Sequence, residues 1–164
     1  DAVVIDYPYY PEGEFGPPKA IAARQKNTMK KWCKWITEGY PGAKVKGWKS
    51  KSWTNGLAFC AMIAHVLPDK IDYMDLKEHH TPLERLEAAF TLAEEELGVE
   101  KVLDAKLDIV DMEGMPIEMM SLMIYLTYLQ PAVDKRMYVN DQEGRAPPAP
   151  PSSASSARAW RVPL

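Results

Sequence analysis

SWTNGLAFCAMIAHVLPDKIDY, residues 52–73, is the stretch of sequence that decides the fold of this chain. After a tryptophan and a turn with glycine, apolar side chains occupy almost every position up to Pro68, which stops the helix. Only Asn55 and His65 give this segment a polar face. A helix that is apolar on nearly all sides must be surrounded by neighbours. We therefore predict a helix over residues 55–67 at the centre of a core.

The segment at residues 83–97 has the clearest helical periodicity. Its apolar residues alternate at spacings of three and four: Leu83, Leu86, Phe90, Ala93 and Leu97. Thr81-Pro82-Leu83-Glu84 is a capping box with proline at the first helical position. Gly98 follows where a left-handed residue commonly ends a helix. These signals predict a helix that packs against the central one.

Two more long helices are expected, one on each side of this region in the sequence. The first runs from about residue 18 to Glu38 and ends at Gly39, and its buried stripe is Ile21, Met29, Trp32, Cys33 and Ile36. The last runs over residues 116–130 and ends at Pro131. We also expect a short helical turn at residues 99–103 and a solvated loop around His79 and His80.

These motifs occur in an order that resembles the calponin-homology domain. The residues that carry the resemblance are Trp32-Cys33, Thr37 to Gly42, Ser52 to Gly56, Pro68-Asp69, Ile71 to Tyr73, Ala89-Phe90, Ala93-Glu94, Leu97-Gly98, Val102 to Asp104, Ser121 and Tyr125. The likeness covers roughly residues 21–132. It is closest to the second-domain type of spectrin and alpha-actinin tandems and to related single-domain proteins. The resemblance implies an all-α calponin-homology fold of four main helices plus short connecting helices.

Length and composition favour one such domain between two extensions. A chain of 164 residues with 46% hydrophobic content can bury one sizeable core. Residues 1–19 form an extended arm rich in proline and tyrosine, which we expect to pack on its own domain or to hold a partner. Residues 20–139 form the domain. Residues 140–164 are rich in proline, serine and alanine and are expected to be a linker or tail.

The charge is strongly polarised although the net charge is only -3. Residues 24–51 hold nine basic residues and one acidic residue, whereas residues 78–118 hold twelve acidic and three basic residues. Such asymmetry favours encounter with an acidic polymer in a salt-dependent manner. The candidate filament- or partner-binding residues on the first helix are Lys26, Lys30, Lys31, Lys34 and Trp35. The alternatives are that these lysines form an ordinary solvated face and that Trp35 packs under the N-terminal aromatic arm.

Other sites have less support. The three histidines have no partner nucleophile in a recognisable motif, so we expect no enzyme, no cofactor and no metal site. We expect the methionines at positions 112, 115, 119, 120 and 123 to fill the core, although an adaptable binding surface is the alternative. Cys33 and Cys60 are expected to be buried thiols rather than disulfide-bonded or reactive ones.

The tail carries one linear motif, formed by Arg145, Pro148 and Pro151. This Arg-x-x-Pro-x-x-Pro pattern suits aromatic grooves that bind polyproline II helices. It is therefore a candidate proline-motif ligand, with a plain linker as the alternative.

The resemblance implies a non-catalytic cytoskeletal module, in the cytoplasm and associated with the cytoskeleton. The first expectation is association with filamentous actin, or its regulation, through a single domain. Domains of the second type bind actin weakly alone, so avidity would help. The alternatives are a protein-protein adapter without direct actin binding, or microtubule binding through the same basic face. No nucleic-acid partner and no membrane span are expected, since the chain is acidic overall and has no apolar run of about 20 residues.

Overall fold

The computed structural model describes residues 18–145 and 147–151, and within them the side chains from residue 26 onward. This part of the chain is helical and contains no strand, which confirms the predicted all-α class. The helices and helical turns are α1 Pro18–Ile36, α2 Lys51–Thr54, α3 Leu57–Val66, α4 Tyr73–His79, α5 Pro82–Leu97, η1 Ala105–Ile109, η2 Val110–Met112 and α6 Met119–Gln142. The N-terminal arm up to residue 17 and the chain beyond residue 151 lie outside the described residues.

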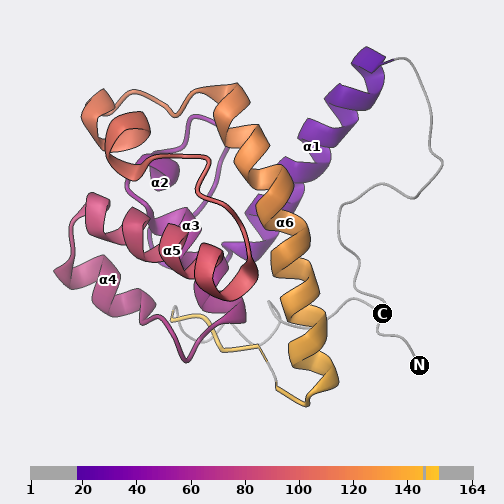
Figure 1. Cartoon of the computed structure of the whole chain (residues 1–164), viewed down its shortest axis with the longest axis vertical. Coiled ribbons are helices and arrows are strands. Elements are labelled where there is room, and N and C mark those ends of the chain that lie inside the picture. The colour runs from indigo at the N-terminus through magenta and orange to yellow at the C-terminus, as the bar shows by residue number, and fades with distance from the viewer. Residues whose placement is uncertain (1–17, 146, 152–164) are drawn as a thin grey trace.

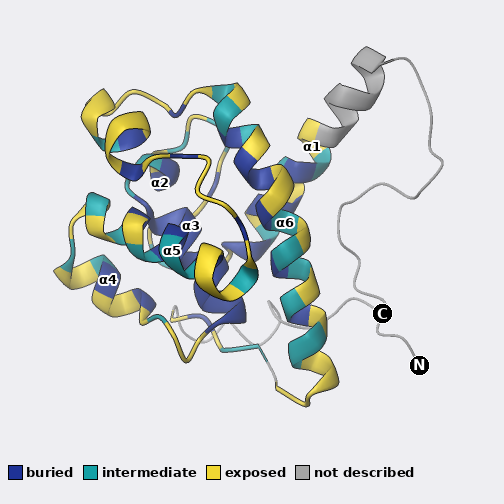
Figure 2. Cartoon of the chain, in the orientation of Figure 1, coloured by how far each residue is buried: buried dark blue, intermediate teal, exposed yellow. Residues whose placement is uncertain are grey.

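Helix α3 is the centre of the core, as its composition predicts. All ten of its residues are buried, α5 and α6 pack against it, and α2 and α4 also contact it (Figures 1 and 2). The prediction that His65 gives this helix a polar face is wrong, because its side chain is only 2% exposed. Burial lowers the pKa of His65 to about 3, so the imidazole is neutral at physiological pH.

Four aromatic rings from four elements meet in the middle of this core. The ring of Phe59 on α3 lies 5.1 Å from Trp53, 5.0 Å from Phe90 and 5.8 Å from Tyr125, measured between centroids. Phe90 and Tyr125 are themselves 5.0 Å apart. Tilted and edge-to-face pairs at these distances add attraction beyond the burial of area. The cluster joins α2, α3, α5 and α6.

The predicted helix at 83–97 is confirmed as α5. Thr81 Oγ1 accepts a hydrogen bond from the amide of Glu84, and the Glu84 side chain accepts one from the amide of Thr81, at 3.2 and 2.9 Å. These bonds satisfy two amides that have no partner inside the helix. Gly98 ends α5 with φ of 73°.

Helix α1 ends at Ile36, two residues before the predicted position, and a turn leads to Gly39 with φ of 87°. Its predicted stripe is buried where side chains are described, and consists of Met29, Trp32, Cys33 and Ile36. Both cysteines are buried free thiols. Burial raises the pKa of Cys60 to about 12 and that of Cys33 further still, so neither thiol is activated.

The prediction that Pro131 ends the last helix is wrong, because α6 continues through it to Gln142. Proline removes one backbone hydrogen bond, but Pro131 itself is exposed and the turns beyond it are held by tertiary contacts. Val133 and Met137 are buried, and the Asn140 side-chain amide donates to the carbonyl of Val66 at 3.0 Å. These contacts fix the second half of the helix against the core.

Two local predictions between the long helices are also wrong. No helical turn forms at 99–103; instead the Asp104 carboxylate accepts hydrogen bonds from the amides of Lys106 and Leu107 and starts η1. The segment expected to be a loop before His80 is the helix α4. Its first turn is capped by Asp72, whose carboxylate accepts from the amide of Asp75 at 3.0 Å.

The expected core role of the methionine group is wrong for three members. Met112, Met115 and Met120 are 48%, 60% and 65% exposed, whereas Met119 and Met123 are half-buried. The structure therefore leaves long apolar side chains on the surface at the start of α6.

Candidate functional site

Lys31 and Lys34 lie on the side of α1 that faces away from its buried stripe, whereas Lys30 lies at the edge of the stripe and Lys26 lies nearly in line with Cys33, two turns earlier. Lys26, Lys31 and Lys34 are exposed and Lys30 is half-buried. Residues three or four positions apart are neighbours on a helix, so Lys34 is a neighbour of both Lys30 and Lys31. Within the described part of the chain none of the four forms an ion pair. We call Lys26, Lys30, Lys31 and Lys34 the basic face.

Trp35, the fifth candidate on α1, lies at the border between this face and the core. It is half-buried, and its ring meets that of His65 edge-on with centroids 6.0 Å apart. Part of the indole therefore packs on α3, and Lys31 is its neighbour one helical turn earlier. Trp48, in contrast, stacks on Trp53 at 6.2 Å in a separate loop.

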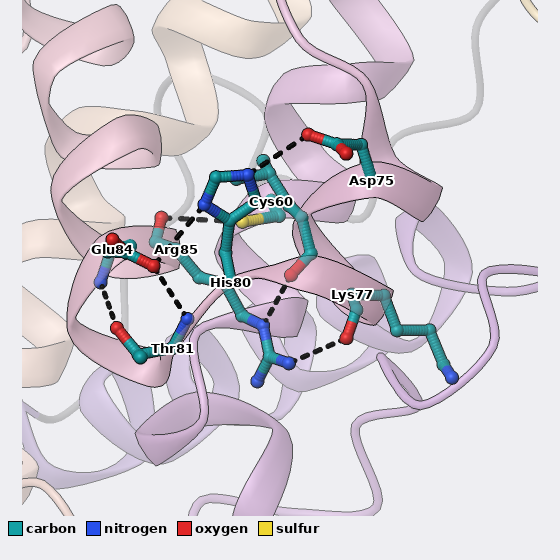
Figure 3. Close-up of polar contacts among 8 residues, drawn as sticks. Cys60, Asp75, Lys77, His80, Thr81, Glu84 and Arg85 are labelled. Carbon is teal, nitrogen blue, oxygen red and sulfur yellow. Dashed lines mark hydrogen bonds and ion pairs between the residues drawn. The ribbon is translucent and has the colours of Figure 1, made fainter.

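A polar cluster that sequence reasoning missed surrounds Arg85 on α5 (Figure 3). Its guanidinium donates to the carbonyls of Leu76 at 2.8 Å, Lys77 at 2.7 Å and Asn55 at 3.3 Å. The carbonyl of Arg85 accepts a weak hydrogen bond from the Cys60 thiol at 3.4 Å. A cation at the carbonyls of the last turn of α4 is favoured by the helix dipole. The cluster joins α3, α4, α5 and the turn before α3, so its role is structural.

His80 lies beside this cluster, between two carboxylates. Its Nε2 is 3.0 Å from Asp75 and its Nδ1 is 3.3 Å from Glu84. The hydrogen bond from the backbone of Thr81, together with His80, lowers the pKa of Glu84. Among the described residues no group of three histidine, cysteine or acidic side chains is arranged to hold a metal ion. His80 thus connects α4 to α5 on the surface.

The residues of the candidate tail motif differ in how far they are exposed. Arg145 and Pro151 are exposed, whereas Pro148 is half-buried and the neighbouring Pro150 is buried. Arg145 also forms an ion pair with Glu143, just beyond α6. A partner that binds this motif in a groove would have to contact both Pro148 and Pro151. Binding through the motif therefore remains a prediction.

Asp134 is a second residue that sequence reasoning missed, because it lies on the part of α6 beyond Pro131. It accepts a hydrogen bond from Trp32 Nε1 at 2.9 Å and so connects α6 to the buried side of α1. Burial raises the pKa of the Asp134 carboxyl to about 7, against a smaller opposite effect of the Trp32 hydrogen bond. One contact between α1 and α6 therefore involves a carboxyl whose pKa burial raises to about 7.

We expect the Asp134→Asn variant to gain more stability over the unchanged protein at pH 8 than at pH 5. The folded carboxyl holds its proton up to about pH 7, whereas the unfolded one loses it near pH 4. The unchanged protein therefore loses stability as pH rises through this window. The gain in free energy of unfolding at pH 8 should exceed that at pH 5 by about 2 kcal/mol. Urea unfolding at both pH values measures it.

The matched control is Asp141→Asn, which changes an exposed aspartate on the same helix. It should leave stability the same at both pH values. An equal gain from Asp134→Asn at pH 5 and pH 8 would show that Asp134 does not titrate in this range.

Comparison with known proteins agrees with this architecture. The calponin homology (CH) domain family matches residues 23–131. The chain is 37% identical over 91 residues to human spectrin beta chain, non-erythrocytic 5, which is 56% of this chain and 2% of that protein. It is 38% identical over 96 residues to mouse F-actin-monooxygenase MICAL3, covering 58% and 5%, and 32% identical over 136 residues to human MICAL-like protein 1, covering 80% and 15%. The chain belongs to the calponin homology domain family.

The matched regions are small parts of these relatives, between 2% and 15% of the lengths given above. Over the residues the structure describes, no helix has the length and apolar character to cross a membrane.

Proposed function

We propose that this chain is a non-catalytic cytoskeletal module that associates with filamentous actin through the basic face of α1. The observation that carries the proposal is the clustering of Lys30, Lys31 and Lys34 on the solvent side of one helix, without an ion-pair partner among the described residues. Actin is an acidic polymer, so such a cluster is attracted to it. One relative is named for F-actin, which supports this choice of polymer.

Trp35 adds a second kind of contact to the proposed site. A half-exposed indole beside lysines can lose water on binding, and tryptophan is enriched among residues that carry binding energy. Because its other edge is held against His65, its conformation is largely fixed before binding. We propose that the lysines attract the filament and that Trp35 provides a desolvated contact. The site uses no cofactor and places the protein at the cytoskeleton in the cytoplasm.

We expect the purified chain to pellet with filamentous actin at low salt and to dissociate as salt rises, because the attraction is screened. Reversing the charges with Lys30→Glu, Lys31→Glu and Lys34→Glu should weaken the affinity at least about tenfold, since three attractions become repulsions. Co-sedimentation across a salt series measures both effects.

The matched control reverses Lys70, Lys101 and Lys106, which are exposed on other elements and give the same change in net charge. This control should bind actin almost as well as the unchanged protein. Equal losses in both triple variants would mean that overall charge, and not the basic face, governs binding.

A parallel series with microtubules separates the polymers. Pelleting with microtubules and not with actin would move the assignment to that polymer. No pelleting with either would favour an adapter that binds another protein.

A further inference from the structure

The surface around η1, η2 and the start of α6 has an unusual combination of exposed apolar and acidic side chains. Four large apolar residues there are 48–65% exposed: Leu107, Met112, Met115 and Met120. We call these four residues the methionine face. Figure 2 shows these turns and the loop after them as mostly exposed, at the end of the molecule away from α4.

Two residues of the methionine face share one turn, and a third lies on a helix. Met112 and Met115 are the ends of one tight turn, in which the amide of Met115 donates to the carbonyl of Met112 at 3.1 Å. Beyond Met120, the exposed Ile124 and Tyr128 follow at intervals of four residues, so they continue along one side of α6. This row covers about 12 Å of helix length. The row on α6 is long enough to contact about two turns of another helix.

Carboxylates border the methionine face. Glu113 lies between Met112 and Met115 in the turn, and Glu118 directly precedes α6; both are exposed and neither has an ion-pair partner among the described residues. Glu118 accepts hydrogen bonds from the amides of Met120 and Ser121, which holds it at the edge of the face. Asp111 is the exception, because Lys106 pairs with it at 2.9 Å. Unpaired negative charge around an apolar centre favours a partner that is apolar in the middle and basic at its edges.

We infer that the methionine face is a docking site for a basic amphipathic helix of a partner protein. Flexible, polarisable methionine side chains adapt to different apolar surfaces, and a helix presents its apolar anchors three or four residues apart. Lysine or arginine beside that stripe would meet Glu113 and Glu118. This site is separate from the basic face and goes beyond the proposed binding of actin.

A second copy of this chain is a less suitable partner for the methionine face. The basic face of α1 has the right charge, but its exposed positions after residue 25 are Lys26, Asn27, Lys31 and Lys34. None of these would cover the methionine side chains. A separate helix with both charge and an apolar stripe fits the face better.

The test uses the full chain with 13C-labelled methionine methyl groups and a peptide of about 18 residues, with leucine at helical spacing and lysine elsewhere. We expect binding that shifts the methyl signals of Met112, Met115 and Met120 and leaves that of the buried Met62 in place. A peptide with glutamate in place of lysine should not bind. A peptide of lysine alone should bind much more weakly, because it cannot cover the apolar side chains.

Variants at the face make the test specific. Met115→Gln with Met120→Gln should weaken the leucine-lysine peptide about tenfold, because two apolar contacts are lost. Met74→Gln, on α4, is the matched control at another exposed methionine and should change nothing. Reversal of Lys30, Lys31 and Lys34 should preserve peptide binding, so failure of the actin proposal and failure of this one are distinguishable.

Three results of the peptide experiments would each overturn the inference. These are no binding of the leucine-lysine peptide, equal binding by the Met115/Met120 variant, and methyl shifts confined to other methionines. Shifts at Met112, Met115 and Met120 that grow with protein concentration in the absence of peptide would also overturn it, and would assign the face to self-association.

Discussion

Replacing Phe59 with alanine is expected to lower the free energy of unfolding by about 4 kcal/mol, the largest effect of any substitution considered for this protein. Phe59 is 1% exposed and its ring contacts those of Trp53, Phe90 and Tyr125. Alanine would leave a cavity between four elements and remove three ring contacts at once. Since a domain of this size is stable by only about 5–15 kcal/mol, a large part of the stability would be lost.

Thermal and urea unfolding measure this loss, and two further variants serve as controls. Phe59→Leu keeps most of the volume and should cost less than half as much, because the cavity is small. Tyr128→Ala removes an aromatic ring that is 59% exposed and should cost little. A loss below about 1.5 kcal/mol for Phe59→Ala would mean that the aromatic cluster is not the centre of the core.

Gly56→Ala is expected to cost about 3 kcal/mol, for two reasons that add. Gly56 has φ of 83°, a left-handed conformation that disfavours any residue with a Cβ. A Cβ there would also lie 2.9 Å from the Cβ of Arg85 and 3.2 Å from the backbone amide of Leu86. Relief of this clash requires the turn before α3 to move away from α5, which would disturb the hydrogen bond from Arg85 to Asn55.

Gly98→Ala separates the two reasons. Gly98 also has positive φ, 73°, but a Cβ there meets nothing within 4 Å. This control should cost only about 1 kcal/mol, from backbone conformation alone. Equal costs at the two glycines would show that the close approach of α5 to the turn is unimportant. Urea unfolding of both variants makes the comparison.

The central and most periodic helices were predictable because their signals are local. The apolar run of α3 and the capping box of α5 act within a few residues, and both helices form where the sequence predicts them. The basic face was predictable in the same sense, since three lysines at helical spacing must share one side of a helix. Its binding to a filament remains a prediction.

The second half of α6 was not predictable, because the strongest local signal there, Pro131, points the other way. Only the burial of Val133 and Met137 and the contact of Asn140 with Val66 show why the helix continues. The most important consequence of this continuation is the position of Asp134. Its hydrogen bond with Trp32 joins residues 102 positions apart and places a carboxyl against the buried side of α1.

By itself, the sequence determined the helical class, the central position of α3, the ends of α5 and the opposite charges of two regions. Periodicity, caps and charge are properties of residues close together in the sequence, so they can be recognised from the sequence alone. The tertiary structure alone decided three matters: that Arg85 holds three carbonyls, that α6 passes through Pro131, and that Met112, Met115 and Met120 stay on the surface. Each depends on which distant side chains come within contact distance, and the spacing of residues along a chain does not specify that.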